Sequence, residues 1–168
     1  MIEQDRAPHD SSIDAGRSID WGQTSTVYVE HRPGPPESFY WMLRAMGIGT
    51  VGQRIHDMGT GTGALARRFA RQGCNVTGID ISAEQIEAAP QLAERERLAV
   101  EFKVAPAEGT GLADQSFDII TACQSWLYFK KPAVCGGVKR LLAPSGRLVT
   151  ADLGWLPPVE GIARGSEG

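Results

Sequence analysis

Short apolar segments alternate with helix-forming segments along most of this chain, and this alternation constrains its fold more than any other feature. Strands are predicted at residues 53–58, 75–81, 100–105, 117–123 and 147–153, and helices at 62–72, 83–97 and 132–142. Strands that alternate with helices of this length form a parallel sheet covered by helices on both faces. In such a sheet, ligands bind beyond the carboxyl ends of the strands.

Local signals add detail to the helices. Ser82 is expected to cap the helix at 83–97, with Gln85 reaching back to complete a capping box. Pro90 is expected to kink or split the same helix. A further helix is expected after the proline-rich turn at 32–36, because four apolar residues recur at the spacing of one helical face. These residues are Phe39, Met42, Leu43 and Met46.

The glycine-rich segment Asp57-Met58-Gly59-Thr60-Gly61-Thr62-Gly63 lies between the first predicted strand and the helix that follows it. Glycine permits a tight turn and leaves no Cβ to keep a ligand away from the backbone. The segment alone is a weak signal, because Gly59, Gly61 and Ala64 also satisfy the loose pattern of a dinucleotide-binding loop. Asp80 strengthens the signal, because a carboxylate at the end of the next strand can accept hydrogen bonds from both hydroxyls of a ribose.

Composition narrows the class of protein. The 168 residues suit one domain, and 42% hydrophobic with 22% charged residues is an ordinary globular balance. A net charge of -3, without a run of basic residues, does not indicate binding to nucleic acid or to an anionic membrane. Three widely spaced cysteines without a CxxC pair favour a reducing cytoplasm over a disulfide framework or a zinc site. The charged residues Arg67, Arg68 and Arg71 and the segment 94–97 are expected on solvated faces.

Four segments carry a resemblance to a known family. Residues 54–63 look like the first motif of class I S-adenosylmethionine-dependent methyltransferases, and residues 79–82 look like the second. Ala107-Glu108, followed by Leu112 and by Ser116-Phe117-Asp118, resembles the segment that covers adenine and leads into the fourth strand. Residues 141–149 resemble the approach to the fifth strand. The resemblance is closest to the small-molecule group that includes the ubiquinone-biosynthesis type. It covers roughly residues 20–165 and is strongest from 53 to 124.

The resemblance implies a Rossmann-like three-layer α/β/α sandwich with a mainly parallel sheet. It divides the chain into a flexible leader (1–20), an N-terminal cap segment and helix (21–50), a cofactor-binding Rossmann-like core (51–155) and a tail (156–168). The family's fold normally continues through another helix and two more strands, so this chain would lack the last strands. We therefore expect either a homodimer through the exposed edge of the fifth strand or a fragment of a longer protein.

The family also implies S-adenosyl-L-methionine as the cofactor and gives roles to the matching residues. The glycines of the first motif would pass beside the methionine and ribose parts of the cofactor. Asp80 would bind the ribose hydroxyls, and Ile81 would pack on the adenine. Ala107 and Glu108 would lie along the adenine edge, and Gln124 near the methionine end. The expected cofactor-binding residues are Tyr28, Asp57, Gly59, Thr60, Gly61, Gly63, Asp80, Ile81, Ala107, Glu108 and Gln124.

An N-terminal segment supplies further candidates. In similar enzymes, a tyrosine followed by Arg-Pro closes over the cofactor, so Tyr28 would reach the methionine carboxylate and Arg32 would orient the segment. His31 is the candidate base where the acceptor must lose a proton. The alternative that this segment is a surface loop without ligand contacts stays open. Two residues depart from the family pattern: Pro106 stands where an aspartate often accepts from the adenine amino group, and His56 replaces an aliphatic residue.

The resulting hypothesis is methyl transfer to a small-molecule acceptor by in-line displacement. The cofactor supplies the electrophilic methyl group, so the chain needs neither a dedicated nucleophile nor a metal. His56 is expected to be a buried histidine rather than a catalyst. Trp126, Tyr128 and Phe129 are expected in the core or in a pocket wall. The alternatives are a cofactor-binding fragment without turnover and an NAD-dependent oxidoreductase that uses the same loop.

Overall fold

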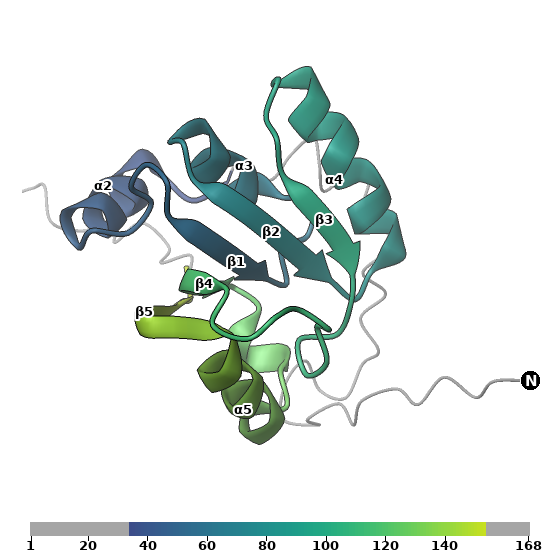
Figure 1. Cartoon of the computed structure of the whole chain (residues 1–168). Coiled ribbons are helices and arrows are strands. Elements are labelled where there is room, and N and C mark those ends of the chain that lie inside the picture. Colours follow the sequence, from purple (N-terminus) through teal and green to yellow (C-terminus); the bar gives the residue numbers. More distant parts are fainter. Residues whose placement is uncertain (1–33, 154–168) are drawn as a thin grey trace, which may run out of the picture.

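The computed structural model describes residues 34–153, which form one α/β unit (Figure 1). The expectations for Tyr28, His31 and Arg32, and those for residues 1–20 and 156–168, lie outside the described residues. Between residues 34 and 153, no helix is both long enough and apolar enough to span a bilayer.

A five-stranded parallel sheet runs through this unit in the order β3-β2-β1-β4-β5. The strands are β1 (Arg54–Met58), β2 (Asn75–Asp80), β3 (Glu101–Val104), β4 (Phe117–Cys123) and β5 (Leu142–Ala151). The chain adds β2 and β3 on one side of β1 and then places β4 and β5 on the other side. The strand order therefore reverses between β1 and β4, which is where open α/β sheets bind ligands. The prediction of a parallel, Rossmann-like α/β fold is confirmed.

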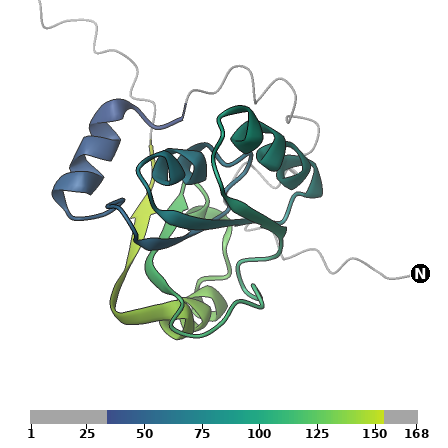
Figure 2. The same cartoon turned by 45° about the horizontal axis from the view of Figure 1, so that its top comes forward.

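Helices cover both faces of the sheet and complete three layers (Figures 1 and 2). The helices are α2 (Glu37–Ala45), α3 (Ala64–Arg71), α4 (Ala83–Arg95) and α5 (Lys131–Leu141), and a short 3-10 turn, η2 (Trp126–Tyr128), follows β4. In both views α2, α3 and α4 lie on one face of the sheet and α5 lies on the other. The layer with α5 is the thinner one, because a loop rather than a helix joins β3 to β4.

Each layer of helices seals one core against the sheet. On the first face, Phe69 of α3 packs in one cluster with Ile55 of β1, and on the second face, Val134 and Leu141 of α5 pack in another with Ile120 of β4. All five side chains are at most 1% exposed. A strand buried on both faces has a continuous apolar sequence, and this explains why β4 was predicted with the bounds that it has.

The buried face of α2 differs from the predicted one. Phe39 and Leu43 are buried as expected, but Met42 and Met46 are 53% and 55% exposed, and Tyr40 takes their place in the core at 6%. Apolar side chains surround most of this short helix, so several faces satisfy the same spacing. Contact with α3 and the sheet, which the local sequence does not encode, selects the face that is buried.

Two expectations about α4 are each corrected in part. Ser82 does cap the helix, since its Oγ accepts a hydrogen bond from the Gln85 backbone N–H at 3.3 Å. The Gln85 side chain does not complete the capping box, because its Oε1 has no partner among the described residues. Pro90 does not split the helix, which continues to Arg95. Pro90 is exposed, so its ring lies outside the packed face of the helix.

Strand β5 begins earlier than predicted and pairs irregularly at first. Leu142 pairs with Phe117, and the regular register with β4 resumes only from Arg147, opposite Ile119. Ser145 has a φ of 68°, which accommodates the intervening bulge. Strands β3 and β5 are the edges of the described sheet. The pairing of β5 with a second copy of the chain stays a prediction.

Arg67 and Arg68 of α3 are less solvated than predicted, whereas Arg71 is 52% exposed as expected. Arg67 has a side chain only 14% exposed and forms an ion pair with Glu96, which also pairs with Arg71. Arg68 has a side chain 26% exposed, pairs with Glu37 and lies 5.0 Å from the centre of the Tyr40 ring. These contacts join α3 to α4 and α2, so the arginines connect the helices of one layer instead of only facing water.

Candidate functional site

The glycine loop, residues 59–63, joins β1 to α3 at the carboxyl edge of the sheet. Gly59, Gly61 and Gly63 have φ angles of 68°, 56° and 80°. Residues with a Cβ rarely adopt this left-handed region, so the path of the loop itself requires glycine at these positions. The sequence predicted the loop correctly from its spacing.

Neighbouring side chains press on the loop from two sides. A Cβ on Gly59 would lie 2.4 Å from Cβ of Ser125, and a Cβ on Gly63 would lie 2.6 Å from the ring of Phe102. Ser125 also donates a hydrogen bond from Oγ to the Met58 carbonyl at 2.7 Å. Segments after β4 and in β3 therefore fix the loop, although neither is near it in sequence.

Asp57 lies beneath the loop and is only 2% exposed. Its two carboxylate oxygens accept hydrogen bonds from the hydroxyls of Thr60 and Thr121, each at 2.7 Å. Burial raises the pKa of this carboxyl from 3.8 to about 6, while the two hydrogen bonds act in the opposite direction. Asp57 therefore ties the loop to β4 from inside the protein. Thr60 belongs to the same tie, and its backbone N–H donates to the Ile79 carbonyl at 2.9 Å.

Asp80 ends β2 and faces the glycine loop. One oxygen, Oδ2, accepts a hydrogen bond from the Gly61 backbone N–H at 2.8 Å, and Oδ1 accepts from the Ser82 backbone N–H at 2.9 Å. Each carboxylate oxygen has a second lone pair, so both can still accept from a ligand hydroxyl. The adjacent Ile81 side chain is 69% exposed, which leaves an apolar surface beside this carboxylate.

Ala107 and Glu108, which were expected along the adenine edge, lie in the core and at the surface respectively. Ala107 is 9% exposed and belongs to the core cluster of α5. Glu108 is exposed, and its Oε1 accepts a hydrogen bond from the Lys130 backbone N–H at 3.0 Å, immediately before α5. In this structure Glu108 therefore holds the start of α5 to the loop after β3.

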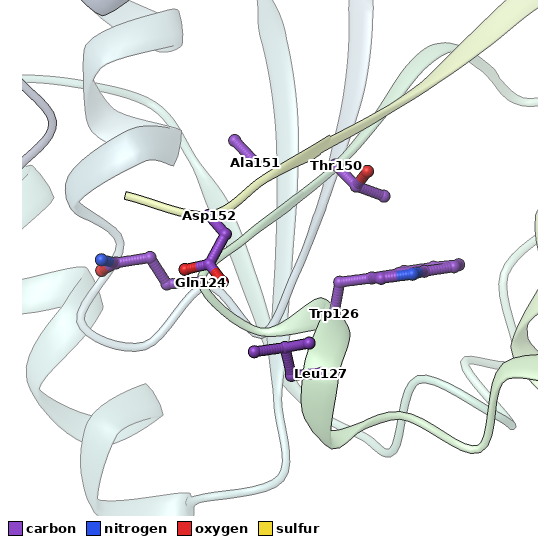
Figure 3. A pocket seen from close by; sticks show the side chains of 6 residues that line it. All are labelled: Gln124, Trp126, Leu127, Thr150, Ala151 and Asp152. Carbon is purple, nitrogen blue, oxygen red and sulfur yellow. The ribbon is translucent and has the colours of Figure 1, made fainter. Parts of the chain in front are cut away.

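Gln124 follows β4 in a left-handed conformation with a φ of 60°. Its backbone N–H donates to the Ala151 carbonyl at 2.7 Å, and its Nε2 donates to the Leu153 carbonyl at 3.1 Å. It lines a small pocket at the ends of β4 and β5, shown in Figure 3. The other residues that line this pocket are Trp126, Leu127, Thr150, Ala151 and Asp152.

Two of the three aromatic residues after β4 lie in the core or in a pocket wall, as predicted. Trp126 and Phe129 are partly buried, pack against the core cluster of α5 and contact each other edge-on, with ring centres 6.1 Å apart. Trp126 also lines the pocket. Tyr128 is 46% exposed. Trp126 therefore lies between the core and the pocket, whereas Tyr128 does not line this pocket.

His56 lies in the middle of β1 and is fully buried. Its ring stacks on Phe117 with centres 5.0 Å apart, and its Nδ1 lies 3.1 Å from the Thr77 carbonyl. Burial lowers the pKa of this imidazole from 6.5 to about 4, so the ring is neutral near pH 7. The expectation of a buried histidine is confirmed, although its Nε2 has no partner among the described residues.

Sequence reasoning missed three residues that shape the site. Thr121 and Ser125 contact the first motif from β4 and from the loop after it, and each lies more than 60 positions from its partner along the chain. Gln85 was taken as a capping residue only, but it is 7% exposed and lies against the loop at Gly61. No local pattern marks the first two, whereas Gln85 is a polar residue on the buried face of α4.

Comparison with known proteins identifies the family to which this site belongs. A family model described as a methyltransferase domain matches residues 56–150, which include the glycine loop and Asp80. The chain belongs to this methyltransferase family. An uncharacterized methyltransferase of Mycobacterium tuberculosis is 32% identical over 149 residues, which cover 83% of this chain and 56% of that protein. A ubiquinone biosynthesis O-methyltransferase of Actinobacillus pleuropneumoniae is 29% identical and covers 76% of this chain and 56% of that enzyme.

Solved structures agree with this assignment. The YcgJ protein of Bacillus subtilis has a TM-score of 0.62 and 28% identity, over 68% of this chain and 49% of that one. Phosphoethanolamine N-methyltransferase 2 of Haemonchus contortus, in complex with S-adenosyl-L-methionine, has a TM-score of 0.64 and 26% identity, over 70% of this chain and 28% of that one. The methyltransferase chain spans about half the length of the curated relatives that it matches.

S-adenosylmethionine is the cofactor of this methyltransferase site, and the described residues fit it. The loop turns tightly through left-handed glycines, and this turn brings its backbone beside Asp80. Asp80 keeps acceptor capacity for ribose hydroxyls at the end of β2. Ile81 offers an exposed apolar side chain on which an adenine ring can pack. These residues thus offer an acceptor for a ribose and an apolar surface for an adenine.

Proposed function

We propose that this methyltransferase transfers a methyl group to a small organic acceptor by in-line displacement. The observation that carries the proposal is the pairing of the glycine loop with Asp80, joined by the hydrogen bond from Gly61. The bound cofactor supplies a methyl group on a sulfonium, which an acceptor atom can displace directly. The chain's own task is to hold the two molecules in line and to exclude water. Such alignment can lower the activation free energy by several kcal/mol.

The cofactor site assigns different tasks to its residues in this proposal. Asp80 accepts from the ribose hydroxyls, while the loop glycines pass beside the ribose and methionine parts. Asp57 and Thr60 hold the loop from below rather than touching the cofactor, because they are only 2% and 8% exposed. In this proposal Tyr28 is a cofactor contact, as the resemblance implies, and His31 is the candidate base where the acceptor must lose a proton.

The acceptor would bind in the pocket after β4 and β5, beside Gln124 and Trp126 (Figure 3). This pocket lies at the carboxyl edge of the sheet, as the glycine loop does. Two of the similar proteins are named for ubiquinone biosynthesis and for phosphoethanolamine, which supports a small molecule as the acceptor. We also propose a cytoplasmic location, because the widely spaced cysteines fit a reducing compartment.

Titration calorimetry of the full chain with S-adenosylmethionine, S-adenosylhomocysteine and NAD tests the cofactor part of the proposal. Binding of the first two without binding of NAD is the expected result, and preferential binding of NAD would favour the oxidoreductase alternative. A methyl-transfer screen against small phenols, amines and thiols then tests turnover. Binding without transfer to any of these acceptors would identify the chain as a cofactor-binding part that does not catalyse alone.

A further inference from the structure

Gln85 has a buried polar atom that nothing in the described protein satisfies. The residue lies in the first turn of α4 and is 7% exposed. Its amide oxygen, Oε1, has no hydrogen-bond partner between residues 34 and 153. An unsatisfied buried acceptor costs roughly 1–3 kcal/mol and is uncommon in folded proteins, so its position calls for an explanation.

The unsatisfied oxygen points at the glycine loop. Oε1 of Gln85 lies 2.7 Å from the point where a Cβ of residue 61 would stand, so it occupies the space that the glycine leaves empty. The backbone N–H of the same Gly61 donates to Asp80. Gln85 and Asp80 therefore contact one residue of the loop, and both present acceptor oxygens beside it.

A purely structural role does not explain an amide at this position. The other buried residues on this face of α4 are Ile86, Ala89 and Ala93, which are all apolar. A methionine or leucine at position 85 would fill similar volume and leave no acceptor unsatisfied. The amide is therefore better explained by a hydrogen-bond donor that arrives with a ligand.

We propose that Gln85 is a further cofactor contact, which accepts a hydrogen bond from a ribose hydroxyl next to the one that Asp80 binds. The inference rests on the proposed function. A ribose presents two neighbouring hydroxyl protons, and each oxygen of Asp80 already uses one lone pair on a backbone N–H, that of Gly61 or of Ser82. A second acceptor lets the two hydroxyls be bound by two side chains instead of competing for one. Gln85 thus sets the selectivity of the site for an intact ribose.

The test compares the wild type with Gln85→Met, which keeps the length of the side chain and removes the amide. Calorimetry would measure the binding of S-adenosylhomocysteine and of its 2′-deoxy and 3′-deoxy analogues. We expect Gln85→Met to weaken binding of the intact ligand roughly three- to tenfold, the effect of one neutral hydrogen bond. We expect the substitution to leave the binding of one deoxy analogue almost unchanged, because that analogue lacks the hydroxyl that Gln85 would bind.

Two controls separate this role from a structural one. Gln91→Met removes an exposed amide from the same helix and should leave binding and selectivity unchanged. The melting temperature of ligand-free Gln85→Met should equal or exceed that of the wild type, because an unsatisfied acceptor has been removed. A large loss of stability together with unchanged ribose selectivity would overturn the inference in favour of a structural amide.

The failure of this inference can be distinguished from failure of the proposed function. Wild type that binds neither S-adenosylmethionine nor S-adenosylhomocysteine would refute the proposed function. Wild type that binds both, with Gln85→Met showing equal affinity and equal selectivity, would refute only the role of Gln85. If Gln85→Met does not fold, the side-chain amide resonance of Gln85 in the wild type decides: it should shift with S-adenosylhomocysteine and less with one deoxy analogue, and an equal response to all three ligands would refute the contact.

Discussion

At the ends of β1 and β2, Asp57 and Asp80 each accept two hydrogen bonds, and the glycine loop between them has no room for a single added methyl group. At the ends of β4 and β5, the site opens onto a pocket whose residues Leu127, Thr150 and Asp152 are exposed. The first region, where we propose that the family's cofactor binds, is fixed by backbone geometry. The second region is lined by exposed side chains that can change without disturbing the core, which suits a region that selects the acceptor.

The largest effect is expected where the loop is tightest. Gly59→Ala combines a φ of 68° with an added Cβ only 2.4 Å from Cβ of Ser125. Left-handed strain and overpacking together should lower the free energy of unfolding by about 3 kcal/mol or more and abolish cofactor binding. Denaturant unfolding and calorimetry would measure both effects.

Gly136 in α5 supplies the matched control. An added Cβ there meets no atom within 4 Å, and the residue is helical. Gly136→Ala should therefore stabilise the protein by about 0.5–1 kcal/mol without changing cofactor affinity. Equal stability of Gly59→Ala and the wild type would contradict the view that backbone geometry fixes the cofactor side.

The next effect concerns how two neighbouring residues of β1 respond to pH. The raised pKa of Asp57, about 6, means that the folded state holds this proton more tightly than the unfolded state, so its contribution to stability falls as pH rises from about 4 to 6. The lowered pKa of His56, about 4, means that the unfolded state takes up its proton first, so stability falls as pH drops from about 6.5 to 4. In the wild type the two slopes largely cancel.

Removing either ionisable group should therefore reveal the pH dependence of stability that the other one causes. Asp57→Asn is expected to give stability that rises by roughly 1–3 kcal/mol between pH 4 and 6.5, because only the histidine slope remains. His56→Leu is expected to give stability that falls over a similar range, because only the aspartate slope remains. Denaturant unfolding at several pH values would measure these slopes, and the same pH dependence in both variants would refute the assignment.

The smallest effect is expected on the acceptor side. Leu127 is 48% exposed and lines the pocket, so Leu127→Ala should change the free energy of unfolding by at most about 0.5 kcal/mol. Cofactor affinity should stay as in the wild type, while KM for an accepted methyl acceptor should rise. A loss of cofactor affinity in Leu127→Ala would show that the two regions are not as separate as the contacts indicate.

Features that follow from local sequence could be predicted, and features that depend on contacts between distant segments could not. The strands, the glycine loop and Asp80 were predictable, because strand periodicity, turn geometry and motif spacing are local properties. The buried face of α2 was not, because contact with α3 and the sheet decides whether Tyr40 or Met42 is buried. The hydrogen bonds that fix the loop from β4 and from the segment after it could not be predicted either. Thr121 lies 64 positions from its partner Asp57, and Ser125 lies 67 positions from its partner Met58, so only the folded sheet brings them together.

The central claim is that Asp80 and the glycine loop jointly bind the adenosine part of S-adenosylmethionine. Calorimetric titration of Asp80→Ala with this ligand tests the claim most directly, with Asp114→Ala, at an exposed surface carboxylate, as the control. Losing hydrogen bonds to a charged acceptor should weaken binding roughly a hundredfold or more in Asp80→Ala and leave Asp114→Ala unchanged. Wild-type affinity in Asp80→Ala, or a wild-type chain that does not bind the ligand, would contradict the claim.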